Sequence, residues 1–98
     1  MLKKFAIEPA AQNKIGLMYY KGLGVVKDYE TAVEWFTLSA EQGFAEAQYN
    51  LGGMYALGQG VVRDEKTAVK WFTLAADQGD ADAQLSLGLM YALGHGVK

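Results

Sequence analysis

The feature that most constrains this chain is a phrase that occurs twice at a fixed distance. Residues 54–61 read MYALGQGV and residues 90–97 read MYALGHGV, so one letter differs between copies 36 positions apart. At the same offset, residues 12–47 match residues 48–83 at 21 of 36 positions, and residues 84–98 match residues 48–62 at 10 of 15. A fixed offset without gaps indicates one structural unit built in tandem. We divide the single 98-residue domain into a degenerate segment, two full repeats and a partial third, at 1–11, 12–47, 48–83 and 84–98.

Each repeat contains two amphipathic helical patterns, which we call the A and B helices. In the second repeat, Gln48, Leu51, Gly52 and Tyr55 recur at spacings that place them on one face of an A helix. Ala68, Trp71, Phe72 and Ala75 follow an i, i+3, i+4, i+7 spacing, which predicts an apolar stripe on a B helix. The sequence therefore predicts five helices joined by short loops, at residues 9–21, 29–42, 45–57, 65–78 and 81–93.

Residues with special backbone roles recur in the same register. Asp28 and Asp64 precede the B helices, where a carboxylate can accept a hydrogen bond from a first-turn amide. Gly43 and Gly79 follow the B helices, where a left-handed turn favours glycine. Three more glycines fall inside the A helices at a cost of about 1 kcal/mol each relative to alanine, so we expect close approach of a neighbouring backbone at Gly16, Gly52 and Gly88. Gly53 is the one glycine that does not recur.

The shared pattern AxAQxxLGxMYxxGxGVVxDxxTAVxWFTLxAxQG resembles the Sel1-like repeat, a relative of the tetratricopeptide repeat, over residues 10–98. The resemblance implies an all-α fold, an α/α right-handed superhelix or solenoid of five antiparallel-stacked helices. It also implies that the A helices line a concave face and that the chain acts as a scaffold in protein–protein interaction. A cysteine-rich branch of the family, for which β-lactamase activity has been proposed, is not matched, because the chain has no cysteine.

Catalytic and cofactor chemistry finds little support in the composition. Without cysteine there is no thiol nucleophile or thiolate metal site. The only histidine, His95, has no ligand cluster beside it, so we expect a solvated loop residue and neither metal nor cofactor. The GxGV phrases follow helices and lack a third glycine, which argues against a dinucleotide-binding loop. We predict that the chain is not an enzyme, and a hydrolase resembling the cysteine-rich branch is the remote alternative.

Charge and hydropathy argue against some classes of partner and indicate a cellular location. A net charge of -2 does not favour nucleic acid, whose binders carry a clustered basic excess. No apolar run is long enough to span a bilayer, so we expect no membrane partner. The start MLKKFAIEPA opens like a signal peptide, but Glu8 and Pro9 interrupt it. The cytoplasm is therefore the expected location.

Positions that vary between repeats while the scaffold recurs are candidates for binding. On the A helices they share the face opposite the recurring one, which the family geometry places on the concave side. The candidate peptide-binding residues are Asn13, Lys14, Leu17, Tyr20, Lys21, Tyr49, Asn50 and Leu57. Lysine and asparagine side chains suit an acidic or C-terminal carboxylate group, and the tyrosines and Leu57 suit apolar side chains. The alternative is that these residues are tolerated surface or pack between neighbouring A helices.

The last A helix carries a continuous leucine stripe formed by Leu85, Leu89 and Leu93. The chain stops at Lys98, where the pattern of a third B helix would begin. Solenoids usually end in a polar cap, since an open end exposes apolar surface. We therefore expect self-association into a homodimer or longer array through the ends, and a self-assembling structural piece is the alternative function. An excised or designed fragment stays an open alternative.

Overall fold

The computed structural model describes residues 8–97, which form five α-helices of 13 residues each, without strands. They are α2 (Pro9–Lys21), α3 (Tyr29–Glu41), α4 (Ala45–Leu57), α5 (Glu65–Asp77) and α6 (Ala81–Leu93). The three A helices, α2, α4 and α6, have the predicted bounds. The B helices α3 and α5 end one residue earlier than predicted, because Gln42 and Gln78 leave the helical conformation as C-caps.

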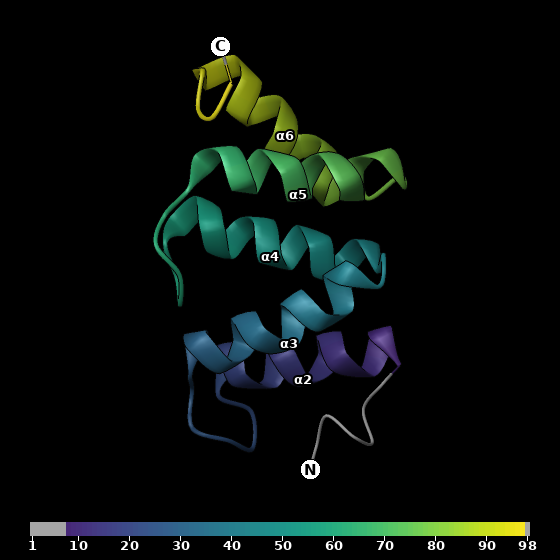
Figure 1. The fold of residues 1–98 in the computed structure, drawn as a ribbon, viewed down its shortest axis with the longest axis vertical. Coiled ribbons are helices and arrows are strands. Elements are labelled where there is room, and N and C mark those ends of the chain that lie inside the picture. The colour runs from purple at the N-terminus through teal and green to yellow at the C-terminus, as the bar shows by residue number, and fades with distance from the viewer. Residues whose placement is uncertain (1–7, 98) are drawn as a thin grey trace.

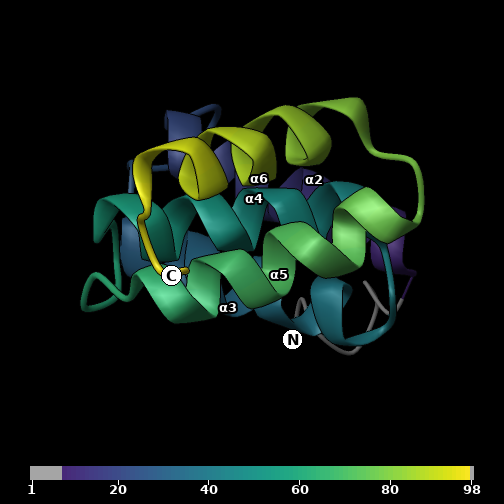
Figure 2. The same cartoon turned by 90° about the horizontal axis from the view of Figure 1, so that it is seen from above.

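The helices stack along one direction into an elongated body of 42 × 24 × 17 Å, with each helix packed on the next in the chain. Seen from above, α2, α4 and α6 form one layer and α3 and α5 the other (Figures 1 and 2). The fold is therefore the all-α helical-repeat solenoid that the sequence predicted. The part of the sequence outside residues 8–97 includes most of the segment 1–11.

Both B helices begin with the predicted aspartate cap. The Thr31 amide donates to Asp28 Oδ1 at 3.2 Å and the Thr31 hydroxyl donates to Oδ2 at 2.7 Å. Thr67 makes the same two hydrogen bonds to Asp64 at the same two distances. In each pair the threonine hydroxyl, followed by the amide, lowers the pKa of the aspartate below its ordinary value near 3.8.

These caps predict how stability depends on pH. A carboxylate whose pKa is depressed by folding stabilises the protein above its ordinary pKa, and that stabilisation is lost as the pH falls below about 4. We expect the Asp28→Asn/Asp64→Asn variant to stay folded at pH 7, since asparagine still offers a capping oxygen. Its thermal midpoint should fall less steeply than that of the wild type between pH 5 and pH 3. Parallel curves in circular dichroism melts would contradict this assignment.

The core lies between consecutive helices. The larger apolar cluster is buried chiefly between α3 and α4 and consists of Ala32, Val33, Phe36, Ala40, Ala47, Leu51 and Met54. A smaller one joins α5 to α6 and consists of Ala68, Phe72 and Met90. The tryptophan and phenylalanine pairs of the B helices pack inward, as their spacing predicted, although Trp71 is only partly buried.

Two of the glycines inside A helices lie under aromatic rings. A Cβ atom on Gly16 would stand 2.6 Å from two Phe36 ring carbons, and one on Gly52 would stand 2.7 Å from Phe72 Cδ1. The expected neighbour was backbone, and that expectation was wrong in its main point: a ring of the following B helix takes the space. At Gly52 a backbone atom, Ala68 O at 3.3 Å, also comes close. Nothing lies within 4 Å of a Cβ placed on Gly88.

A buried glutamine in the first turns of α2 and α4 links each of these helices to B-helix ends through its amide. Gln48 is 4% exposed; its Nε2 donates to Ala40 O of α3 at 3.2 Å, and its Oε1 accepts from Gln78 Nε2 at 2.9 Å. In the first repeat, Gln12 Oε1 accepts from Gln42 Nε2 at 2.6 Å. The recurrence of this glutamine is thus explained by the polar groups at B-helix ends, which must be satisfied once buried.

The second glycine of the second and third GxGV phrases fits against the preceding repeat. Gly60 has φ 74°, and a Cβ atom there would stand 2.5 Å from Tyr29 O at the start of α3. Gly96 has the same φ and would place a Cβ atom 2.6 Å from Glu65 O at the start of α5. Gly24, with φ 73°, has nothing within 4 Å of a Cβ. The phrase that repeats in the sequence is therefore a contact between repeats as well as a turn.

Candidate functional site

Two hollows lie on the A-helix layer, one between α2 and α4 and the other between α4 and α6. The first hollow has a volume of about 280 Å³ and is lined by Tyr20, Phe36, Tyr49, Asn50, Gly53, Met54, Leu57 and Gln59. The second has a volume of about 400 Å³ and is lined by Tyr49, Gly53, Ala56, Leu57, Arg63, Glu65, Phe72, Ser86, Leu89, Met90 and His95. Both share Tyr49, Gly53 and Leu57 of α4, so we treat them as one A-helix groove.

The two hollows are the same site repeated. Six positions of the first hollow reappear in the second, 36 residues later: Ala56, Phe72, Ser86, Leu89, Met90 and His95 stand for Tyr20, Phe36, Asn50, Gly53, Met54 and Gln59. Each pair of adjacent A helices thus forms one subsite. The substitutions between them change its chemistry while the B-helix phenylalanine wall is kept.

Gly53 lies where the two hollows meet. Its equivalents in the other repeats are Leu17 and Leu89, and nothing lies within 4 Å of a Cβ placed on Gly53. Unlike Gly16 and Gly52, it therefore meets no packing requirement, although a glycine inside a helix costs about 1 kcal/mol relative to alanine. The absence of a side chain at Gly53 leaves open space at the centre of the groove.

Three polar residues of the first hollow, Tyr20, Asn50 and Gln59, have hydrogen-bond partners within the chain. The Tyr20 hydroxyl donates to Gln59 Oε1 at 3.4 Å, and Asn50 Nδ2 donates to Asn13 Oδ1 at 3.0 Å. The Tyr20 ring stacks on Tyr29 with centroids 5.3 Å apart. No charged residue is among those that line the first hollow. This subsite is therefore neutral, with aromatic and aliphatic walls.

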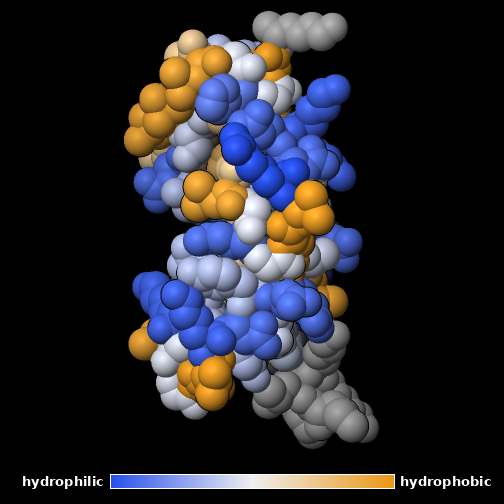
Figure 3. All heavy atoms as spheres, turned by 90° about the vertical axis from the view of Figure 1, so that its left-hand side faces the viewer, coloured by the Kyte–Doolittle hydropathy of each residue, from blue (hydrophilic) through white to orange (hydrophobic). Residues whose placement is uncertain are grey.

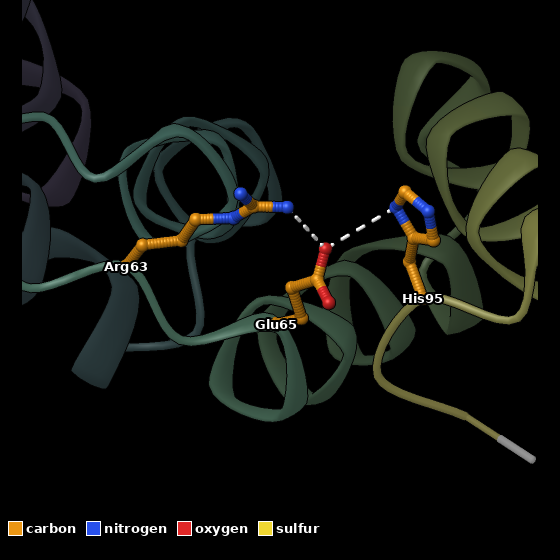
Figure 4. Close-up of polar contacts among 3 residues, drawn as sticks. All are labelled: Arg63, Glu65 and His95. Atoms are coloured by element: carbon orange, nitrogen blue, oxygen red, sulfur yellow. Dashed lines mark hydrogen bonds and ion pairs between the residues drawn. The ribbon is translucent and has the colours of Figure 1, made fainter.

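The second hollow has an ionic cluster at its edge (Figure 4). Arg63 Nη2 donates to Glu65 Oε2 at 2.7 Å, and His95 Nδ1 lies 3.2 Å from the same oxygen. The arginine side chain is 61% exposed and the histidine side chain 50% exposed. His95, predicted as a solvated loop residue, therefore has a fixed neighbour as well as solvent, because the loop after α6 folds onto the start of α5.

The structure brings together half of the residues predicted to bind a peptide. Tyr20, Tyr49, Asn50 and Leu57 line the groove. Asn13 does not: it is 3% exposed and also donates to Glu46 Oε2 at 2.7 Å, so it packs between α2 and α4. Three further predicted residues line neither hollow: Leu17 packs against the core, and Lys14 and Lys21 are exposed to solvent.

The predicted leucine stripe on α6 is exposed, at 65% for Leu85, 53% for Leu89 and 66% for Leu93. Figure 3 shows hydrophobic atoms gathered at the upper end of the molecule, at the level of α6. Leu89 also lines the second hollow, whereas Leu85 and Leu93 line neither hollow. The stripe and the groove are therefore separate surfaces that meet at one residue.

Some groove residues could not be identified from their own helix. Gln59, Arg63, Glu65 and His95 come from loops and from the first turn of a B helix. A search for variable faces on A helices omits them. The signal that was available is their variation at equivalent repeat positions, since Gln59 and His95 stand in the same slot of the GxGV phrase.

Within residues 8–97, no three His, Asp or Glu side chains gather closely enough to hold a metal ion. Among the same residues, no helix is both long and apolar enough to cross a bilayer. The groove therefore offers apolar walls, amide and hydroxyl groups, and one ionic cluster.

Comparison with known proteins places this geometry among repeat proteins. The Sel1 repeat model matches residues 9–44, 45–80 and 81–98. A Sel1 repeat protein from Oxalobacter formigenes is 48% identical, with a TM-score of 0.90 over 92% of this chain and 37% of that one. The protective antigen c5321 of uropathogenic Escherichia coli strains, which displays an SLR fold, is 46% identical, with a TM-score of 0.91 over 92% of this chain and 19% of that one.

Cysteine-rich protein B of Helicobacter pylori is more distant, at 31% identity and a TM-score of 0.73 over 76% of this chain and 56% of that one. In all three comparisons the chain spans well under two thirds of the length of the similar protein. What the similar chains share with this one is the stacked helical repeat.

Proposed function

Since the chain belongs to the Sel1 repeat family, whose members commonly mediate protein–protein interaction, we propose that it binds an extended segment of a partner protein in the A-helix groove, without catalysis. One observation carries the proposal: two hollows of about 280 and 400 Å³ join at Gly53, where the other repeats carry leucine. Concave apolar sites with a few polar groups are where proteins most often bind ligands.

The first hollow suits an apolar side chain of the partner. The Tyr20 hydroxyl and the Asn50 amide nitrogen are engaged in hydrogen bonds to Gln59 and Asn13, so a polar side chain that used these two groups would have to displace those bonds. Its walls include Phe36, Met54 and Leu57. Burying an apolar side chain there gains about 25 cal/mol for each Å² removed from water. Lys14 and Lys21, exposed on α2, stay available to acidic residues that flank this anchor.

Filling the groove at its centre tests the proposal. Random ten-residue peptides are displayed and selected on the immobilised chain, and the affinity of a selected peptide is measured by fluorescence anisotropy. Gly53→Leu, which copies Leu17 and Leu89, should weaken binding at least tenfold, because the leucine occupies the space where the hollows join. The variant should stay folded, since the other repeats accept leucine at this position.

Gly53→Ala is the matched control. A methyl group there meets nothing within 4 Å, so this variant should bind the peptide with little change in affinity. Its free energy of unfolding should be about 1 kcal/mol higher than that of the wild type, because alanine favours the helix more than glycine does. Undiminished binding by Gly53→Leu would place the ligand elsewhere. A failure to select any peptide above the level of an unrelated helical protein would contradict the proposal.

The exposed α6 surface favours a second candidate, self-association of the chain into a homodimer or longer array. Three leucines that are each more than half exposed form an apolar surface on one helix, and exposed apolar patches often mark interaction sites. Light scattering over a wide concentration range should then show a dimer or larger species. Leu85→Gln/Leu93→Gln should dissociate it, and Gly53→Leu should not. A monomer at every concentration would exclude this candidate.

A further inference from the structure

We propose that the second hollow accepts an acidic side chain, aspartate or glutamate, of the bound segment through Arg63 and His95. This inference rests on the proposed function, because it assigns the chemistry of one half of the same groove. It differs from the sequence-based expectation of an acidic partner, which relied on Lys14 and Lys21, neither of which lines a hollow. The basic side chains that line the groove itself are Arg63 and His95.

Glu65 holds the Arg63 and His95 side chains in place. Figure 4 shows Arg63 and His95 approaching its carboxylate from opposite sides. Both meet the same oxygen, Oε2, at 2.7 Å and 3.2 Å. A guanidinium group has five N–H donors, and the imidazole has a second ring nitrogen, so each side chain keeps hydrogen-bonding capacity beyond Glu65. Their exposed fractions of 61% and 50% leave that capacity within reach of a ligand in the hollow.

The equivalent cluster in the first repeat has a different chemistry. There Lys27 lies over the Tyr29 ring, 4.8 Å from its centroid, and a hydrogen bond with Tyr29 raises the pKa of Lys27. Tyr29 stacks on Tyr20, which donates to Gln59. In the second repeat the four corresponding positions carry Arg63, Glu65, Ala56 and His95. The aromatic side chains that fill the first site are thus replaced by an ionic cluster beside an alanine.

Charge complementarity favours an acid over a base in this hollow. The described lining carries one carboxylate, Glu65, beside the basic side chains of Arg63 and His95. A lysine or arginine of a partner would have to compete with both for that carboxylate. An aspartate or glutamate instead meets the N–H donors of the Arg63 guanidinium group that Glu65 does not use, and hydrogen bonds between charged groups are about twice as strong as neutral ones.

The test uses peptides displayed with both ends fused to a scaffold, so that no free terminal carboxylate is present. Selection on the 98-residue chain at pH 6 should enrich peptides that contain aspartate or glutamate. Each selected peptide is then compared with its acid-to-amide analogue on the wild type and on Arg63→Gln/His95→Gln. The histidine replacement copies Gln59, and Lys27→Gln is the control at the equivalent position of the other repeat.

We expect the acidic peptide to bind the wild type at least tenfold more tightly than its amide analogue, and to lose this advantage on the double variant. The amide analogue should bind both proteins equally, which shows that the variant still folds and keeps the groove.

Three results would overturn the inference. Selected peptides without acidic residues, or acidic peptides indifferent to the double variant, would do so and leave the proposed function standing. If the wild type recovered no more peptide than the Gly53→Leu variant does, both the proposed function and this inference would be contradicted.

Discussion

Replacing Phe36 with alanine should lower the free energy of unfolding by about 3–5 kcal/mol, the range for deleting a buried aromatic ring. Phe36 is 1% exposed, belongs to the larger core cluster and lies directly over Gly16. The missing ring would leave a cavity between α2 and α3, and the rigid helices around it could close it only in part. Urea unfolding followed by circular dichroism measures the loss.

A second substitution shows whether the contact with Gly16 is the cause. In the wild type, Gly16→Ala should destabilise, since its Cβ atom would stand 2.6 Å from the Phe36 ring. In the Phe36→Ala background the same change should stabilise, because the methyl group enters the cavity and the helix gains about 1 kcal/mol from replacing glycine. A change of the same sign in both backgrounds would contradict this packing. Val26→Ala, at an 88% exposed position, should change stability by less than about 0.5 kcal/mol.

Gly60→Ala should be the most damaging change in the loops. Alanine there must adopt a φ of 74°, and its Cβ atom would stand 2.5 Å from the Tyr29 carbonyl oxygen. The left-handed conformation alone costs about 1–2 kcal/mol. The overlap with backbone adds about 1–3 kcal/mol, since it must push the second repeat away from the start of α3.

Gly24→Ala separates these two contributions. Gly24 has a φ of 73° but no atom within 4 Å of a Cβ, so alanine there should cost only the conformational part. Thermal and urea unfolding of the two variants should therefore differ by about 1–3 kcal/mol. Equal losses would mean that the contact between Gly60 and α3 does not stabilise the joint between repeats.

The helices were predictable because their signals are local. Asp28 and Asp64 cap the B helices through the threonine three residues later, and Gly43 and Gly79 take φ values of 89° and 92° after them. Such interactions involve residues a few positions apart. Because the repeat places the same residues at the same positions every 36 residues, the secondary structure of one segment could be predicted from its copy.

The groove was less predictable because neighbours from different repeats form it. Asn13 and Tyr20 both vary between repeats and both lie on α2, yet Asn13 is buried against α4 while Tyr20 lines the first hollow. A face of one helix does not specify the angle at which the next helix covers it. His95 was likewise uninformative by itself, since its contact with Glu65 depends on how the loop after α6 folds back.

The sequence by itself determined the repeat, the helices and the inward-facing aromatic residues, because periodicity and capping act within about one helical turn or one repeat. Only the tertiary structure decided that Phe36 and Phe72 occupy the space over Gly16 and Gly52, that Gly53 opens a groove, and that Arg63 and His95 meet at Glu65. Those features depend on the separation and angle between stacked helices, which close packing of many side chains sets together.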